Sequence, residues 1–120
     1  MNENWEQDFE WLRVRHYVKD ALRKEDLPDL QTILFLIGVQ ELGLLQKSFT
    51  KEEKQDLMHI AVCSLLSEDG YYTYKGNDQD GWPHWEKNRT IKKLSLEEQE
   101  SLLIEKTINY FNLNHDEENQ

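Results

Sequence analysis

Two matching helix-start signals constrain this chain more than any other feature. Thr50-Lys51-Glu52-Glu53 and Ser95-Leu96-Glu97-Glu98 each place a hydroxyl residue three positions before a glutamate. In such a capping box, the hydroxyl and the carboxylate satisfy backbone N–H groups reciprocally in the first turn of a helix. Apolar residues at helical spacing follow each box, so we expect two helices to begin directly after Thr50 and Ser95.

The two helices that follow these boxes each have one apolar face. The face of the earlier helix consists of Leu57, Met58, Ala61, Val62 and Leu65, and Asp69-Gly70 ends that helix. The face of the later helix consists of Leu96, Leu103, Ile104, Thr107, Ile108 and Phe111. We expect the later helix to end near Leu113 and the polar tail, residues 114–120, to fray.

Another helix is predicted over residues 28–42. Pro28 suits the first turn of a helix, where its missing N–H is no loss, and Gly43 is placed to cap the C-terminus. Apolar residues from Ile33 to Val39 surround the axis, which is typical of a central, buried helix. Gly38 would allow another backbone to approach closely. A short strand over the same apolar run is the alternative.

The first helix, expected from about Asn4 to Lys24, carries two apolar stripes. One stripe consists of Trp11, Val14, Val18, Ala21 and Leu22. The other, on a different side, consists of Trp5, Phe9 and Leu12, together with His16. A helix that packs on one core needs only one stripe. The second stripe is therefore either covered within the monomer or a face for binding or dimerisation.

An aromatic segment, residues 71–93, separates the two capped helices. Tyr71, Tyr72 and Tyr74 suit a short strand, residues 76–81 suit a turn, and Trp82 to Glu86 suit a return strand. Pro83 restricts that return strand to an edge position. We expect a small β-hairpin or an ordered loop here. The fold class is then mostly α, a four-helix assembly in a single domain over residues 1–113.

Composition narrows the classes of partner. The 120 residues include 14 Lys and Arg against 24 Asp and Glu, without a dense basic cluster, so we expect neither nucleic acid nor a membrane as partner. The net charge of −10 would favour a basic partner. The single cysteine, Cys63, excludes an intramolecular disulfide. Since no stretch reads as a signal peptide or a membrane span, we expect a cytoplasmic location.

Two surfaces are candidates for binding. The first is the stripe of Trp5, Phe9 and Leu12. The second is the aromatic segment, where large rings stand among polar groups: Tyr72, Tyr74, Asp78, Asp80, Trp82, His84 and Trp85. In the opposing interpretation, these aromatic residues pack the segment onto the open end of the helices as a satellite core.

Two other patterns resemble parts of metal or thiol sites. Asp56, His59 and Cys63 share one side of a helix, as a metal site or an activated thiolate would require. A buried cysteine beside solvated polar residues is the simpler interpretation. The run Asp78-Gln79-Asp80-Gly81 resembles part of a calcium loop, but Gly76 and Lys87 stand where acidic ligands belong. We expect no metal, no cofactor and no catalytic residue.

These patterns favour a non-catalytic protein-interaction or accessory domain that binds a protein partner, or associates with itself, through aromatic surfaces. The alternative is a small ligand-binding domain or an enzyme that uses residues 71–86 as the wall of a pocket. Asp78, Asp80, His84 or Glu86 would then supply the polar groups. A further alternative is an acidic mimic of nucleic acid, which requires carboxylates arrayed along one surface.

Overall fold

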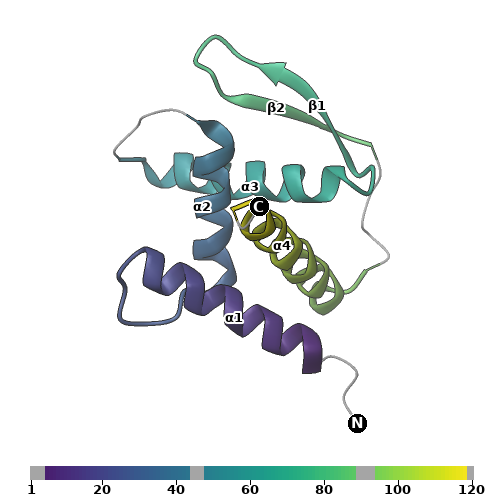
Figure 1. Cartoon of the computed structure of the whole chain (residues 1–120). Helices are drawn as coiled ribbons and strands as arrows, with labels where there is room; N and C mark the ends of the chain where they lie inside the picture. The colour runs from purple at the N-terminus through teal and green to yellow at the C-terminus, as the bar shows by residue number, and fades with distance from the viewer. Residues whose placement is uncertain (1–4, 44–47, 89–93, 119–120) are drawn as a thin grey trace.

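The computed structural model of the chain describes residues 5–43, 48–88 and 94–118, with side chains up to residue 112. Its elements in chain order are α1 (Trp5–Ala21), α2 (Leu30–Leu42), α3 (Lys51–Ser67), β1 (Tyr72–Asn77), β2 (Pro83–Lys87) and α4 (Leu96–Glu118). This order confirms a mostly α assembly of four helices with a β-hairpin between α3 and α4 (Figure 1). None of the described helices has both the length and the apolar character needed to cross a membrane.

Both predicted capping boxes are formed. The Thr50 hydroxyl accepts from the Glu53 N–H at 3.1 Å, and the Glu53 carboxylate accepts from the Thr50 N–H at 2.9 Å. Ser95 and Glu98 repeat the arrangement at 3.1 and 2.9 Å. Since these bonds satisfy N–H groups that lack a partner in the first turn, they fix where α3 and α4 begin.

The start of α2 differs from the prediction. Asp29 is the N-cap, and its carboxylate accepts from the Thr32 N–H at 2.9 Å. Pro28 therefore lies before the cap rather than in the first turn, because a carboxylate satisfies the free N–H groups there. The Pro28 carbonyl accepts instead from Arg15 Nε of α1 at 2.8 Å. Gly43 caps the C-terminus with φ 70°, as predicted.

Helix α1 also ends earlier than predicted, at Ala21 rather than Lys24. Arg23 adopts a left-handed conformation with φ 55°, and the Lys24 N–H donates to the Lys19 carbonyl at 3.0 Å. This closure satisfies a carbonyl of the last turn and so terminates the helix. Ala21 and Leu22, which we assigned to the core-facing stripe, are exposed at this end, so that assignment is wrong for these two residues.

The centre of the fold is the packing of α2 on α3. Ile33 and Ile37 of α2 are fully buried, and so is Leu57 of α3. A Cβ on Gly38 would stand 2.0 Å from the Leu57 carbonyl oxygen, so the two backbones approach too closely for any other residue. The sequence predicted both the central position of α2 and the close approach at Gly38.

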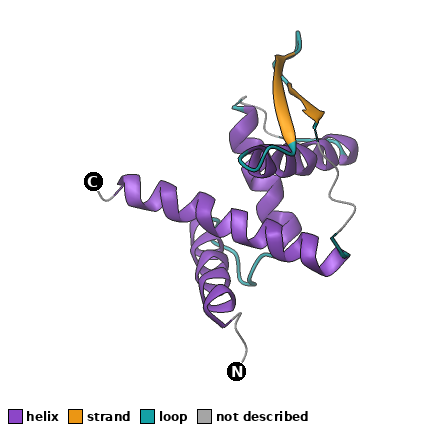
Figure 2. Ribbon diagram, turned by 90° about the vertical axis from the view of Figure 1, so that its right-hand side faces the viewer, coloured by secondary structure: helices purple, strands orange, loops and turns teal. Residues whose placement is uncertain are grey.

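The hairpin covers the side of α3 that faces away from α2. Its antiparallel register pairs Tyr72 with Lys87 and Tyr74 with Trp85. The Tyr72 ring meets the His59 ring edge to face, with centroids 6.1 Å apart. Helix α3 consequently lies between the hairpin and the other helices, as two views at right angles show (Figures 1 and 2).

Helix α4 departs from the prediction at both ends. It continues to Glu118, beyond the expected end near Leu113, while the fraying expected for residues 114–120 stays a prediction. Residues 119–120 lie outside the described residues. At the other end Leu96 is 83% exposed and does not join the inner face, because it lies in the first turn, before the helix reaches the core. Between the two ends of α4, the Lys106 ammonium pairs with the Asp69 carboxylate at 3.0 Å.

Candidate functional site

The outer side of α1 exposes three large apolar side chains. Trp5 is 56% exposed, Phe9 61% and Leu12 43%. At 3.6 residues per turn they lie about 180° around the helix from Val14, which is buried. We call Trp5, Phe9 and Leu12 the outer stripe. No described element of the monomer covers it, so its residues have no role in the core.

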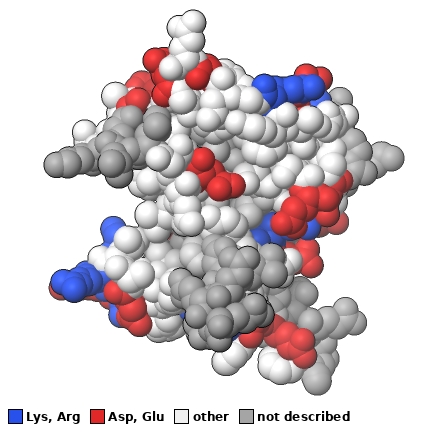
Figure 3. All heavy atoms as spheres, turned by 45° about the horizontal axis from the view of Figure 1, so that its top comes forward, with Lys and Arg blue, Asp and Glu red and all other residues white. Residues whose placement is uncertain are grey.

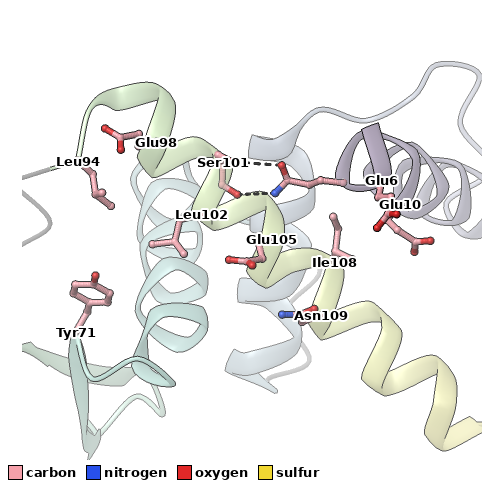
Figure 4. A pocket seen from close by; sticks show the side chains of 11 residues that line it. Glu6, Glu10, Tyr71, Leu94, Glu98, Ser101, Leu102, Glu105, Ile108 and Asn109 are labelled. Atoms are coloured by element: carbon pink, nitrogen blue, oxygen red, sulfur yellow. Dashed lines mark hydrogen bonds between the residues drawn. The ribbon is translucent and has the colours of Figure 1, made fainter. Parts of the chain in front are cut away.

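A groove runs between α1 and α4 beside the outer stripe. Its cavity volume is about 700 Å³. Gln7 fixes the crossing of the two helices, because its amide donates to the Ser101 carbonyl at 3.2 Å and its oxygen accepts from the Ser101 hydroxyl at 3.4 Å (Figure 4). On the hairpin side of the crossing, three apolar side chains point toward one another: Tyr71, Leu94 and Leu102 (Figure 4).

The charged residues that line this groove are all glutamates: Glu6, Glu10, Glu98 and Glu105. Glu6 follows Trp5 and Glu10 follows Phe9 in sequence, so each glutamate stands about 100° around α1 from the residue before it. We call this feature the glutamate groove. Sequence reasoning missed it, because the crossing that creates it joins residues 94 positions apart. The periodicity of a single helix carries no signal for such a crossing.

A second cavity lies between α3 and the hairpin. Its volume is about 440 Å³, and we call it the hairpin cleft. From α3 it is lined by Glu53, Asp56, His59 and Ile60, and from the hairpin by Asp78, Asp80, Trp82, Pro83, His84 and Trp85. The fold thus brings five of the predicted binding residues together with three polar residues of α3. Tyr72, Tyr74 and the outer stripe do not line this cleft.

Asp78 organises the turn of the hairpin. One carboxylate oxygen accepts from the N–H groups of Asp80 and Trp82 at 2.9 and 3.0 Å, and the other meets His84 Nε2 at 2.9 Å. The contact with His84, followed by the N–H of Trp82, holds the pKa of Asp78 below its ordinary value. The carboxylate of Asp78 is therefore fully engaged in shaping the turn.

The two tryptophans of the hairpin have different environments. Trp82 packs against the buried cluster of Leu42, Leu57 and Ile60, so it anchors the turn on α2 and α3. Trp85 packs on Tyr74 across the strands, with ring centroids 5.4 Å apart. The Trp85 indole N–H is buried and has no acceptor within the described part of the chain. The packing interpretation thus holds for Trp82, although the same residue also lines the cleft.

The arrangement of Asp56, His59 and Cys63 does not favour thiol chemistry. Cys63 is fully buried beneath the hairpin, and its Sγ lies 3.5 Å from His59 Nε2. Burial raises the pKa of the Cys63 thiol to about 11, so the thiol stays protonated at neutral pH. Among the described residues, no group of three or more His, Cys, Asp or Glu side chains is placed to hold a metal ion.

The acidic charge on one face of the molecule is divided into separate groups. On the face shown in Figure 3, Asp and Glu side chains form separate groups with uncharged surface between them. A mimic of nucleic acid needs carboxylates in a continuous array along one surface. This face gives that alternative no support.

Comparison with known proteins gives no match: no protein-family model matches the sequence, and no curated protein or solved structure matches the chain. The candidate sites therefore rest on the chemistry of the described residues alone. They are the outer stripe with its neighbouring glutamate groove, and the hairpin cleft on the far side of α3.

Proposed function

We propose that this chain is a non-catalytic protein-interaction domain that binds a protein partner through the outer stripe of α1. One observation carries the proposal: Trp5, Phe9 and Leu12 are 56%, 61% and 43% exposed on the side of α1 opposite its buried side. Large apolar and aromatic residues that cluster outside a core are the residues on which binding energy concentrates in interfaces.

The energetics of the outer stripe suit a moderate interface. Fully burying a large apolar side chain contributes about 1.5–3 kcal/mol, and about half of each stripe residue is exposed, so a partner gains on the order of 1 kcal/mol per residue. Because this apolar contribution is moderate, polar contacts at the rim of the interface can add specificity. Glu6 of the glutamate groove supplies negative charge for that rim, whereas Glu10 is paired with Arg13 at 2.6 Å.

Charge distinguishes a different protein from a second copy of this chain. Each copy carries a formal net charge of −10, and Glu6 stands near the stripe, so two copies would bring like charges together. Like charges that face one another across an interface are destabilising. A partner segment with apolar residues on one side and Lys or Arg on its flank suits the stripe and the groove together. We therefore propose such a partner rather than self-association.

Two further features support a binding role without catalysis. The Cys63 thiol is buried and protonated, and the Asp78 carboxylate is engaged within its own turn, so neither is available as a nucleophile or a base. A cytoplasmic location is part of the proposal, and the single, unpaired Cys63 supports it.

The test is co-purification of the tagged full chain from its native cells, followed by isolation of the partner and calorimetric titration. We expect a stoichiometric partner whose affinity falls at least about tenfold for the double variant Trp5→Ser/Phe9→Ser. The matched control is Leu96→Ser, because Leu96 is also a large exposed apolar residue but lies on α4, outside the stripe. Both variants should keep the melting temperature of the parent.

Three outcomes would contradict the proposal. One is a chain that remains monomeric and retains no stoichiometric partner. Another is a partner that binds Trp5→Ser/Phe9→Ser as tightly as the parent chain. Equal weakening by Leu96→Ser would place the interface elsewhere on the surface and would contradict the role of the outer stripe as well.

A further inference from the structure

The hairpin cleft is a separate feature from the outer stripe, and it does not depend on the proposed function. It opens between the N-terminal half of α3 and the turn of the hairpin, with a volume of about 440 Å³. Cavities that hold small organic ligands have volumes of roughly 300–1,000 Å³. The cleft is therefore large enough to take a small molecule or one long side chain.

The polar lining of the cleft is acidic. Four carboxylates line it, from Glu53, Asp56, Asp78 and Asp80, and the described lining contains neither Lys nor Arg. His59 and His84 are the basic groups there, and His84 already contacts the Asp78 carboxylate at 2.9 Å. The contact with His84 occupies Asp78, and the other three carboxylates have neither Lys nor Arg beside them in the described lining.

Two of these carboxylates are engaged in the fold and two are not. Glu53 accepts from the Thr50 N–H in its capping box, and both oxygens of Asp78 are engaged within the turn. Asp56 and Asp80 are exposed, and neither side chain has a hydrogen bond or an ion pair with any described residue. They stand on opposite walls of the cleft, one on α3 and the other on the turn.

The uncharged lining is mainly aromatic and apolar: Ile60, Trp82, Pro83 and Trp85. Indole faces attract cations within about 6 Å of the ring centre, and they attract delocalised or alkylated cations best. A bare metal ion is a poor fit, since the described acidic and histidine side chains form no group that would coordinate one. The carboxylates and the indoles independently favour the same chemical class, an organic cation.

We propose that the hairpin cleft binds an organic cation with a primary ammonium or guanidinium group. Asp56 and Asp80 accept hydrogen bonds from the cation, while Trp82 and Trp85 contact its alkyl chain and its charged face. Charge-assisted hydrogen bonds to carboxylates are about twice as strong as neutral ones, which gives the cation an advantage over an uncharged molecule of equal shape. The cation belongs either to a free small amine or to a Lys or Arg side chain of a peptide.

The test is an NMR titration of the full chain with agmatine, which carries an ammonium and a guanidinium group. The chain has four tryptophans, so its indole N–H signals report on two separate regions. We expect the signals of Trp82 and Trp85 to move with saturation and those of Trp5 and Trp11 on α1 to stay in place. The double variant Asp56→Asn/Asp80→Asn should weaken binding at least about tenfold, because it removes two charged acceptors and keeps the shape.

The matched control is Asp20→Asn, which removes an exposed carboxylate on α1, away from the cleft. Asp20→Asn should leave the affinity for agmatine unchanged. An uncharged analogue, in which the amine of agmatine is acetylated and the guanidinium is replaced by urea, should not bind. A parallel titration with acetyl-Gly-Arg-Gly-amide separates the two sources of the cation: tighter binding of the peptide assigns the cleft to a side chain, and tighter binding of agmatine assigns it to a free amine.

Three results would overturn the proposal. The first is the absence of saturable shifts at Trp82 and Trp85 with both probes. The second is an equal effect of Asp20→Asn and the cleft variant, which would show that the net charge attracts cations without a site. The third is equal binding of the uncharged analogue. An unchanged amide spectrum of each variant verifies that loss of binding is not loss of fold.

Discussion

Helices α1 and α3 both carry apolar side chains on two opposite sides, and they differ in what covers the second side. In α3, Leu57 meets α2, and Leu66, about 180° around the axis, is buried as well. In α1, Val14 is buried, whereas Trp5 on the opposite side is exposed. The hairpin supplies the cover on α3, and no described element supplies one on α1.

This difference separates residues that specify the fold from residues that are free for function. Every apolar residue of α3 named above stabilises the monomer, so its presence is explained by packing. Trp5, Phe9 and Leu12 contribute little to the monomer, so their presence requires another explanation. We therefore expect changes on either side of α3 to lower stability, and changes on the outer side of α1 to affect binding only.

The largest effect is expected where α2 and α3 touch. Gly38→Ala would place a Cβ 2.0 Å from the Leu57 carbonyl oxygen, so the helices must separate. We expect a loss of about 4 kcal/mol or more in the free energy of unfolding, measured by urea denaturation. Gly43→Ala is the control, because its Cβ meets nothing within 4 Å and φ is 70°. The left-handed backbone alone should lower stability by about 1 kcal/mol. Equal losses would show that α2 and α3 are not in close contact.

The next largest effect is expected on the second side of α3, and it can be compared directly with the outer side of α1. Leu66→Ala removes a buried side chain from α3 and should lower the free energy of unfolding by about 3 kcal/mol. Leu12→Ala removes the same side chain from the outer stripe of α1 and should change it by no more than about 0.5 kcal/mol. Chemical denaturation of both variants measures the difference. A loss at Leu12 comparable to that at Leu66 would mean that the outer stripe is covered in the monomer.

The alkylation rate of a thiol on α3 and of one on α1 reports the same difference in cover. Burial raises the pKa of Cys63 from 9.0 to about 11, so its thiolate fraction is about 100-fold lower than that of a free thiol. We expect slow alkylation of native Cys63 by iodoacetamide near pH 8. The double variant Leu12→Cys/Cys63→Ala should react about as fast as a free thiol. Rapid alkylation of Cys63 in the folded chain would argue that the hairpin does not cover α3.

The smallest effect concerns the turn that holds this cover in place. The pKa of Asp78 is lowered from 3.8 by His84 and by the N–H groups of Trp82 and Asp80. The stability it contributes is complete above the unfolded pKa and is lost as the pH falls through the lower folded pKa. We expect the Trp82 indole signal to change below pH 3.8 in the parent chain. The same acid transition in Asp78→Asn would assign it to another group.

Local chemistry made much of the fold predictable. The boxes at Thr50 and Ser95 specify their helix starts through bonds between residues three positions apart, so sequence is sufficient there. Gly38 was predicted to allow a close approach, and it does. Pro28 was misplaced because Asp29 competes for the cap. Leu96 was misplaced because helical periodicity does not say where along α4 the core begins.

The candidate sites were predictable only in part. Asp78, Asp80, Trp82, His84 and Trp85 come together because a hairpin places near neighbours in sequence on one turn. Their meeting with α3 depends on how the hairpin docks, which no local pattern determines. The glutamate groove depends in the same way on the crossing of α1 and α4. The sequence showed that α1 has a second stripe, but only the tertiary structure shows that it is exposed.

Hydroxyl-radical footprinting tests the central contrast most directly, because it labels side chains according to their exposure. In the purified chain we predict rapid oxidation of Trp5 and Phe9 and slow oxidation of buried Leu66. In the complex isolated from native cells, Trp5 and Phe9 should become protected, whereas exposed Leu96 should be labelled as before. Protection of Trp5 and Phe9 already in the purified monomer, or equal labelling in both states, would contradict the assignment of the outer stripe as a binding surface.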